Sequence, residues 1–152
     1  MRGTNGEVGP NPNSGAASTM ETVCLVDDDP SIRKSVTRLL QSADYKVNAF
    51  AEAEPFLVYL AGNSVSVAVL DIWMARMTGM ELLAHLCAQS PNTKVIFITG
   101  HEHRAAEATV MQAGAFGFLI KPLDSNEFLA MIERAFATSS PASTRGERKT
   151  RQ

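Results

Sequence analysis

The chain has 152 residues, of which 45% are hydrophobic and 20% charged, and its formal net charge is −2 at pH 7. These values fit one folded globular domain and exclude a disordered, collagen-like or strongly polyanion-binding chain. The sequence shows neither an apolar run of the roughly 18 residues that a membrane span needs nor a signal-peptide pattern, so we expect a cytoplasmic protein without membrane contact. Cys24 and Cys87 stand far apart in apolar stretches with no CxxC pair, which predicts two buried free thiols.

The two ends of the chain differ in composition from its middle. Residues 1–20 are rich in Gly, Asn, Pro, Ser and Thr and hold almost no large apolar side chains, so we expect a disordered tail. Residues 139–152 begin with SSPAST and continue into a basic run, which predicts a disordered linker or tail. Contact of this run with nucleic acid is the alternative, although a solvated charge run is the commoner meaning. The folded domain is therefore expected at residues 21–138.

The first half of this domain reads as two strand and helix pairs. A strand is predicted at Val23–Val26, and a helix with Pro30 in its first turn follows. The residues expected on the buried face of this helix, spaced i, i+4, i+7 and i+8, are Ile32, Val36, Leu39 and Leu40. A second strand is predicted at Tyr45–Phe50, and Phe56, Leu57 and Leu60 indicate a shorter second helix.

The second half repeats this alternation three times. Strands are predicted at Val65–Leu70, Lys94–Thr99 and Ala115–Ile120. A helix marked by Leu82, Leu83 and Leu86 follows the first of them. A weakly amphipathic, Ala-rich helix at His103–Ala113 follows the second. Asp124 and Glu127 resemble a capping box before the last helix, whose buried stripe is predicted to hold Phe128, Met131, Ile132, Ala135 and Phe136. Five such pairs predict an α/β fold, a doubly wound five-stranded parallel sheet with five helices.

Polar residues follow the predicted strands where functional groups gather in such sheets, at the carboxyl ends. Asp27, Asp28 and Asp29 follow the first strand, Asp71 follows the third, Thr99 ends the fourth and Lys121 follows the fifth. Taken singly, each has a structural explanation: Asp29 before Pro30 suits a helix N-cap, and Thr99 suits a strand. Their shared edge instead predicts a phosphoryl-transfer site, in which a carboxylate accepts phosphate beside a cation and an ammonium.

These residues resemble the receiver domain of two-component response regulators, over roughly Glu21–Thr138. The resemblance is carried by VCLVDDDPSIRKSVTRLL, VAVLDIWMARMTGMELL, VIFITGH and GAFGFLIKPLDSNEFLAMI, in that order. It implies the (βα)₅ flavodoxin-like receiver fold of the CheY-like superfamily, with closest similarity to receivers of LuxR- and FixJ-type transcriptional regulators. It also implies a signalling domain rather than an enzyme.

The resemblance implies a role for each polar residue at this edge. Asp71 corresponds to the phosphoacceptor, and Thr99 and Lys121 to the phosphoryl contacts. The implied Mg²⁺ ligands are Asp27, Asp28, Asp71 and the backbone carbonyl of Trp73. The resemblance further implies a cis Lys121–Pro122 peptide and a switch made by Thr99 and Phe118, although Phe118 in a static core position is the alternative.

Two departures concern the loop after Asp71. The family commonly has Pro where Ala75 stands, which predicts a more mobile loop. Trp73 is large for its position, and we hypothesise that it shields the phosphoryl group from water; a ring that points away to bind a partner is the equal alternative. His101 is a further candidate for modulating that water, while a metal pair of His101 and His103 is weakly supported and surface positions are expected.

The resemblance also implies partners. Phosphorylation by a sensor histidine kinase would change the face formed by the fourth helix, fifth strand and fifth helix, which would control a homodimer or an output domain. The residues after the last helix are too few for a helix-turn-helix domain, so DNA contact is expected only through an output domain outside this chain. A short polar segment after the last helix is compatible with a fragment of a longer regulator and with a stand-alone receiver.

Three rival functions come from other classes. The run Asp27–Ser31 loosely resembles the start of haloacid-dehalogenase-like phosphatases, which would leave Asp71 without a strong role. A flavodoxin-like nucleotide-binding module would need a phosphate loop where this acidic run stands. A degenerate receiver acting only as a scaffold is disfavoured by the full set of acids, Thr99 and Lys121.

Overall fold

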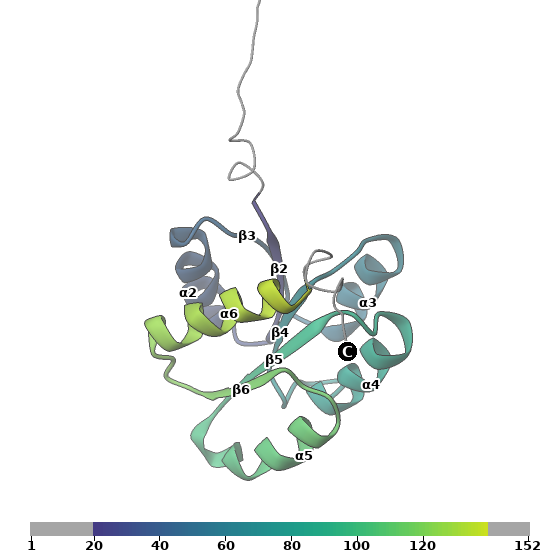
Figure 1. Cartoon of the computed structure of the whole chain (residues 1–152). Coiled ribbons are helices and arrows are strands. Elements are labelled where there is room, and N and C mark those ends of the chain that lie inside the picture. Colours follow the sequence, from purple (N-terminus) through teal and green to yellow (C-terminus); the bar gives the residue numbers. More distant parts are fainter. Residues whose placement is uncertain (1–19, 140–152) are drawn as a thin grey trace, which may run out of the picture.

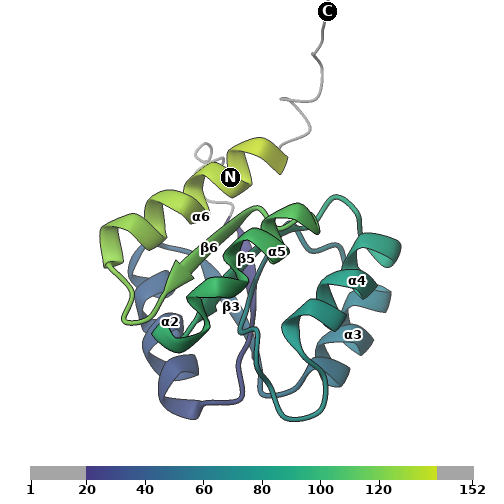
Figure 2. The same ribbon diagram turned by 90° about the horizontal axis from the view of Figure 1, so that it is seen from below.

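A computed structural model describes residues 20–139, which form one parallel sheet between two layers of helices (Figures 1 and 2). The strands are β2 (Thr22–Val26), β3 (Lys46–Phe50), β4 (Val67–Leu70), β5 (Lys94–Thr99) and β6 (Gly117–Ile120). The helices are α2 (Pro30–Ser42), α3 (Ala53–Gly62), α4 (Gly79–Gln89), α5 (Glu107–Gln112) and α6 (Ser125–Ser139), with a 3₁₀ helix η1 (His101–Ala106) before α5. The predicted tails, apart from Met20 and Ser139, lie outside the described residues.

The strand order is β3-β2-β4-β5-β6, and all neighbouring pairs are parallel. This order confirms the predicted doubly wound five-stranded sheet. Val26 and Leu70 are register partners at the carboxyl ends of β2 and β4, so Asp27 and Asp71 leave the sheet side by side. The order therefore decides which strand ends become neighbours.

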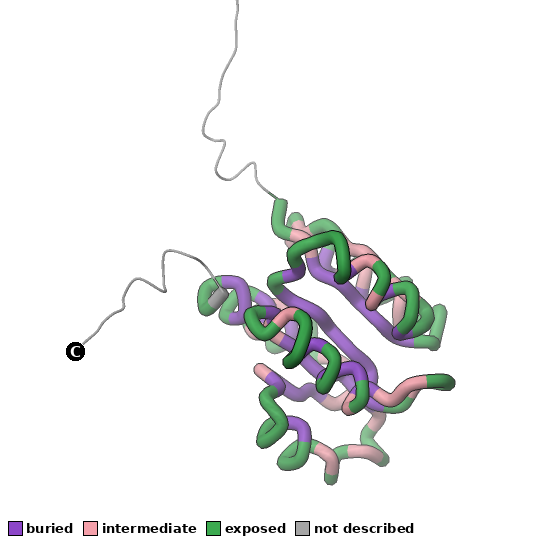
Figure 3. Tube along the Cα trace, turned by 90° about the vertical axis from the view of Figure 1, so that its right-hand side faces the viewer, coloured by how far each residue is buried: buried purple, intermediate pink, exposed green. Residues whose placement is uncertain are grey.

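Two apolar layers hold the helices against the sheet. The layer under α2 and α6 includes Val36, Leu40, Phe128 and Ile132, whereas the layer under α3, α4 and α5 includes Phe56, Leu82, Leu86 and Val110. Figure 3 shows the buried strands in the centre, with exposed helix surfaces outside them. Most strand residues are buried because helices cover both faces, which explains their continuous apolar runs.

Side-chain caps mark the starts of three helices. Asp29 Oδ1 accepts hydrogen bonds from the backbone N–H groups of Ser31 and Ile32, which confirms Asp29 as the N-cap of α2. Asp124 Oδ1 accepts from the Glu127 N–H at the start of α6. A full capping box of Thr78 and Glu81 begins α4. The T-x-x-E pattern of Thr78 and Glu81 signals this box in the sequence, but the box was not among the predicted caps.

The structure corrects two sequence predictions. The segment predicted as one helix at His103–Ala113 begins as the 3₁₀ helix η1 and becomes α-helical only at Glu107. Only Val110 of η1 and α5 is buried, so few packing contacts favour a regular α-helix here. Cys87 is exposed, while Cys24 is buried as predicted. Cys87 follows the buried Leu86 on α4, and one helical step turns it about 100° away from the core. Within residues 20–139, no helix combines the length and apolar character needed to cross a membrane.

Candidate functional site

The carboxyl end of β2 carries a completely buried acid, Asp27. The Asp27 N–H donates to the carbonyl of Phe50, which extends the pairing of β2 with β3 by one residue. Both carboxylate oxygens have partners: Oδ1 accepts from the Asp29 N–H at 2.9 Å, and Oδ2 lies 3.0 Å from Lys121 Nζ. A buried carboxylate is tolerable only with such compensation, so Asp27 is held in one orientation.

Asp71 follows β4 directly and is 8% exposed. Its N–H donates to the carbonyl of Val26, so the main chain of Asp71 is fixed against β2. Burial and the neighbouring Asp27 carboxylate raise the pKa of Asp71, while Lys121 and the backbone N–H groups of Ile72 and Trp73 oppose the rise. The carboxyl group is thus held close to a second acid at a cost in electrostatic free energy.

Lys121 reaches this acidic pair from the end of β6. Its N–H donates to the Thr99 carbonyl at 2.8 Å, and the following peptide bond to Pro122 is cis, as the resemblance implied. Lys121 Nζ lies 3.0 Å from Asp27 Oδ2 and 3.7 Å from Asp71 Oδ2, and the side chain is 20% exposed. A single ammonium therefore bridges two carboxylates that follow different strands.

Asp28 completes a cluster of three acids. Ligand oxygens of Asp27, Asp28 and Asp71 all lie within 4.8 Å of one another, and Asp28 is the exposed member. Three carboxylates against the Lys121 ammonium leave an excess of negative charge. Carboxylate oxygens are the ligands that Mg²⁺ prefers, so the donor set fits a small divalent cation with an open side toward solvent. The role of the Trp73 carbonyl as a further ligand stays a prediction.

The two predicted switch residues lie on β5 and β6 and are buried. Thr99 is completely buried, and its Oγ1 has no hydrogen-bond partner among the described residues. A buried hydroxyl without a partner is costly, and such groups in native proteins often serve a ligand or a second conformation. Phe118 is 9% exposed and belongs to the apolar layer under α3, α4 and α5. The structure thus has Phe118 in a core position, and its movement stays a prediction.

The Trp73 side chain is half exposed, at 52%. Its ring lies against that of His103 in η1, with centroids 5.3 Å apart and planes tilted by 46°. His103 Nε2 lies 3.6 Å from Glu102 Oε2, while His101 is exposed. The loop after Asp71 therefore contacts the segment after β5 through one ring pair. The shielding role of Trp73 and the greater mobility of the loop at Ala75 stay predictions.

Sequence reasoning missed Gly79, the first residue of α4, which lies against the Asp71 backbone. A methyl group on Gly79 would lie 2.5 Å from the Asp71 carbonyl oxygen and 2.7 Å from Phe97 Cε1. The Gly79 N–H also donates to the Ile72 carbonyl at 2.6 Å. Only glycine permits this approach of helix to strand end. The glycine after the Thr78 cap is visible in the sequence, but the contact depends on tertiary packing.

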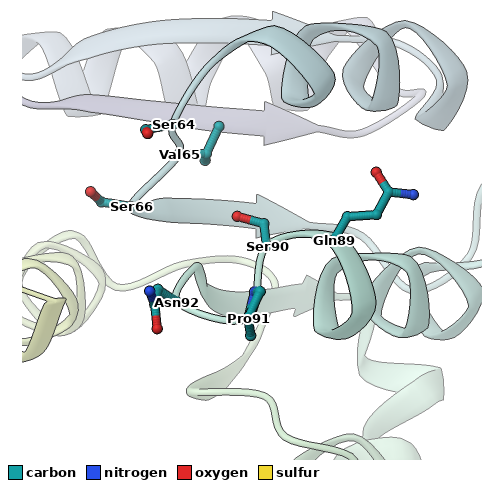
Figure 4. A pocket seen from close by; sticks show the side chains of 7 residues that line it. All are labelled: Ser64, Val65, Ser66, Gln89, Ser90, Pro91 and Asn92. Atoms are coloured by element: carbon teal, nitrogen blue, oxygen red, sulfur yellow. The ribbon is translucent and has the colours of Figure 1, made fainter.

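A hollow of about 350 Å³ lies elsewhere, between the connections that lead into β4 and β5 (Figure 4). Ser64 and Ser66 line one side, and Gln89, Ser90 and Asn92 line the other. These connections enter the amino ends of the strands, opposite the acidic cluster. The lining carries no charged side chain, so it lacks the carboxylates and the ammonium that distinguish the carboxyl edge. The groups suited to that chemistry are those at the carboxyl edge.

Comparisons with known proteins agree with one another. The family described as the response regulator receiver domain matches residues 23–133. The transcriptional regulatory protein FixJ of Bradyrhizobium diazoefficiens is 35% identical over 125 residues, which cover 82% of this chain and 61% of FixJ. The chain therefore spans about three fifths of that relative.

Solved structures show the same similarity. The crystal structure of full-length FixJ from B. japonicum superposes with a TM-score of 0.78 at 35% identity, covering 83% of this chain and 63% of that one. The solution structure of the beryllofluoride-activated NtrC4 receiver domain dimer has a TM-score of 0.75 at 30% identity, covering 80% of this chain and all of that one.

Proposed function

The chain belongs to the response regulator receiver domain family, and from this premise we propose that Asp71 is its phosphoacceptor. One observation carries the proposal: Asp27, Asp28 and Asp71 meet within 4.8 Å, and Lys121 bridges Asp27 and Asp71. These side chains come from three strand ends. A shared position for a carboxylate nucleophile, two further acids and one ammonium is the set that phosphoryl transfer to an aspartate needs.

The acidic cluster fits Mg²⁺, and we propose that Asp27, Asp28, Asp71 and the Trp73 carbonyl hold it. When bound, the ion offsets the negative charge that an incoming phosphoryl group and the carboxylates share. Asp27 is already oriented by the Asp29 N–H and Lys121, so the site requires little rearrangement of this acid. The exposed Asp28 is the ligand free to adjust.

The chain's own residues then divide the transfer among them. An Asp71 carboxylate oxygen forms a bond to phosphorus while the phosphorus–nitrogen bond of a kinase phosphohistidine breaks, and the histidine nitrogen keeps the bonding electron pair. Lys121 lies 3.7 Å from Asp71 Oδ2 and offers a compact positive charge to the transferred group. Thr99 ends β5, and its buried hydroxyl, which has no partner among the described residues, is a group that can donate to a phosphoryl oxygen.

Signalling follows if the phosphoryl group favours one of two conformations. A hydrogen bond from the Thr99 hydroxyl to a phosphoryl oxygen would give this buried group a partner. It would also draw the end of β5 toward Asp71. Phe118 lies on β6, the strand paired with β5, so a shift of Thr99 reaches it through adjacent packing. We propose that α5, β6 and α6 form the surface that changes.

We propose that the partners are a sensor histidine kinase and a second copy of this chain at that surface. The NtrC4 receiver is described as a dimer when activated, which supports the second partner. Any DNA contact would belong to an output domain, because FixJ is described as a transcriptional regulator and the chain covers only 61% of it. We also propose that the folded unit is residues 21–138.

The alternative of a haloacid-dehalogenase-like phosphatase is not supported. The family that matches is the receiver domain, over residues 23–133. A phosphatase of that type would also give Asp71 no chemical role, although Asp71 lies in the acidic cluster. We therefore expect one phosphoryl group accepted per chain and no catalytic turnover of phosphomonoesters.

Intact-mass measurement after incubation with acetyl phosphate and Mg²⁺ tests the proposal. We expect wild-type protein to gain one phosphoryl group, and Asp71→Asn or EDTA to prevent the gain. Asp44→Asn is the matched control, since Asp44 lies in the turn before β3 with a φ of 71° that Asn tolerates, and it should be phosphorylated normally. Equal phosphorylation of Asp71→Asn and wild type would contradict the proposal.

A further inference from the structure

The turn between β2 and α2 carries two of the three clustered acids, and Arg33 holds this turn from outside the cluster. Arg33 lies in the first part of α2 and is partly buried. Its Nη1 donates a hydrogen bond of 2.8 Å to the backbone carbonyl of Asp27. The contact ties α2 to the first residue after β2, which lies six residues before Arg33 in the chain.

Further hydrogen bonds of this turn are made by the side chains of Asp27 and Asp29. The Asp29 N–H donates to Asp27 Oδ1, and Asp29 caps α2 through its own carboxylate. Lys121 takes the other Asp27 oxygen. Arg33 differs from Lys121 because it binds a main-chain carbonyl. It therefore occupies no carboxylate oxygen of the cluster. It can therefore order the acids without occupying a ligand position.

Groups that orient metal ligands are important for affinity, because a loose ligand must be ordered when the ion binds. A guanidinium suits this role, since it stays charged and its planar donors lose little freedom per bond formed. We propose that Arg33 is a positioning residue that presets the Asp27–Asp28 turn for a divalent cation. This inference rests on the proposed function and adds a residue to its machinery.

The direction in which Mg²⁺ affinity changes when Arg33 is removed distinguishes a positioning role from a simple charge effect. A positive charge near a cation site repels the cation, so removing Arg33 would strengthen Mg²⁺ binding if charge alone mattered. The positioning role predicts the opposite, weaker binding. The two explanations cannot both account for one measured change.

Magnesium titration followed by fluorescence of Trp73, the one tryptophan of the chain, measures this change. We expect Arg33→Met to raise the Kd for Mg²⁺ about tenfold, as loss of an orienting partner typically does. Arg33→Lys should bind with intermediate Kd, because one donor and the charge remain. The matched control Lys34→Met removes the adjacent exposed cation, and its Kd should not rise. An Arg33→Met protein that binds Mg²⁺ as tightly as wild type, or more tightly, would overturn the proposal.

A second measurement needs no metal. In EDTA, hydrogen exchange of the Asp29 amide should be faster in Arg33→Met than in wild type, because its acceptor Asp27 Oδ1 is less firmly held. Lys34→Met should leave this amide unchanged. Equal exchange in Arg33→Met and wild type would overturn the positioning role. Wild-type protein that does not bind Mg²⁺ would refute the proposed function instead, and the exchange experiment would still decide whether Arg33 holds the turn.

Discussion

Replacing Asp71 by Asn should stabilise the metal-free protein. Burial and the Asp27 carboxylate raise the pKa of Asp71, so its ionised form is less favourable in the folded than in the unfolded chain. Asparagine has nearly the same size and its oxygen still accepts from backbone N–H groups, but it carries no charge. The wild-type penalty is complete above the folded-state pKa, declines as the pH falls through that pKa and vanishes below the unfolded-state value. The advantage of the variant should shrink over the same interval.

Burial and the neighbouring charges together set the size of this effect. The ligand oxygen of Asp27 lies within 4.8 Å of that of Asp71, so Asp27 repels the Asp71 carboxylate by at least about 3.5 kcal/mol at an effective dielectric constant of about 20. Lys121 Nζ lies 3.7 Å from Asp71 Oδ2 and attracts this carboxylate by about 4.5 kcal/mol at the same dielectric constant. The repulsion by Asp27 and the attraction by Lys121 therefore nearly cancel, and desolvation of the buried carboxylate, the largest cause of its raised pKa, decides the sign. Relieving this burial cost should raise the free energy of unfolding by about 1 to 2 kcal/mol.

Urea unfolding followed by circular dichroism, in EDTA and then in Mg²⁺, provides the assay. The matched control Glu52→Gln neutralises an exposed acid that makes no side-chain cap bond, and should change stability by no more than about 0.5 kcal/mol. At a hundredfold excess of Mg²⁺ over its Kd, wild-type protein should gain about 2.7 kcal/mol and Asp71→Asn less. An Asp71→Asn protein less stable than wild type in EDTA would refute the electrostatic reasoning.

Three further predictions concern single side chains. Trp73→Asn should shorten the half-life of the phosphorylated protein if the ring shields Asp71; an equal or longer half-life would count against shielding. Cys87 should react with a thiol reagent at pH 8 in the native protein, whereas Cys24 should react only on unfolding, since burial raises its pKa to about 11; rapid modification of both would contradict the packing. Thr99→Val should raise the free energy of unfolding in EDTA by about 1 kcal/mol, because it removes a buried hydroxyl without a described partner. Equilibrium denaturation measures this, and a loss of stability would indicate that the hydroxyl is bonded.

The sequence was sufficient to predict the helices and strands, because each produces a local pattern of apolar residues and caps. The run Lys94–Thr99 coincides with β5, and the other predicted strands begin within two residues of the observed ones. The helical stripe of α2 and the Asp29 cap were readable for the same reason. The one helix with a weak stripe, at His103–Ala113, is the one whose first part is 3₁₀.

Tertiary structure alone decided which residues meet. That polar groups follow several strands is a sequence property, but Asp27 lies beside Asp71 because β2 pairs with β4, and strand order depends on how helices pack across the whole sheet. Lys121 bridges this pair from a distant part of the chain. The contacts of Arg33 and Gly79 and the exposure of Cys87 were likewise invisible, since they depend on the approach of one element to another, which no local periodicity encodes.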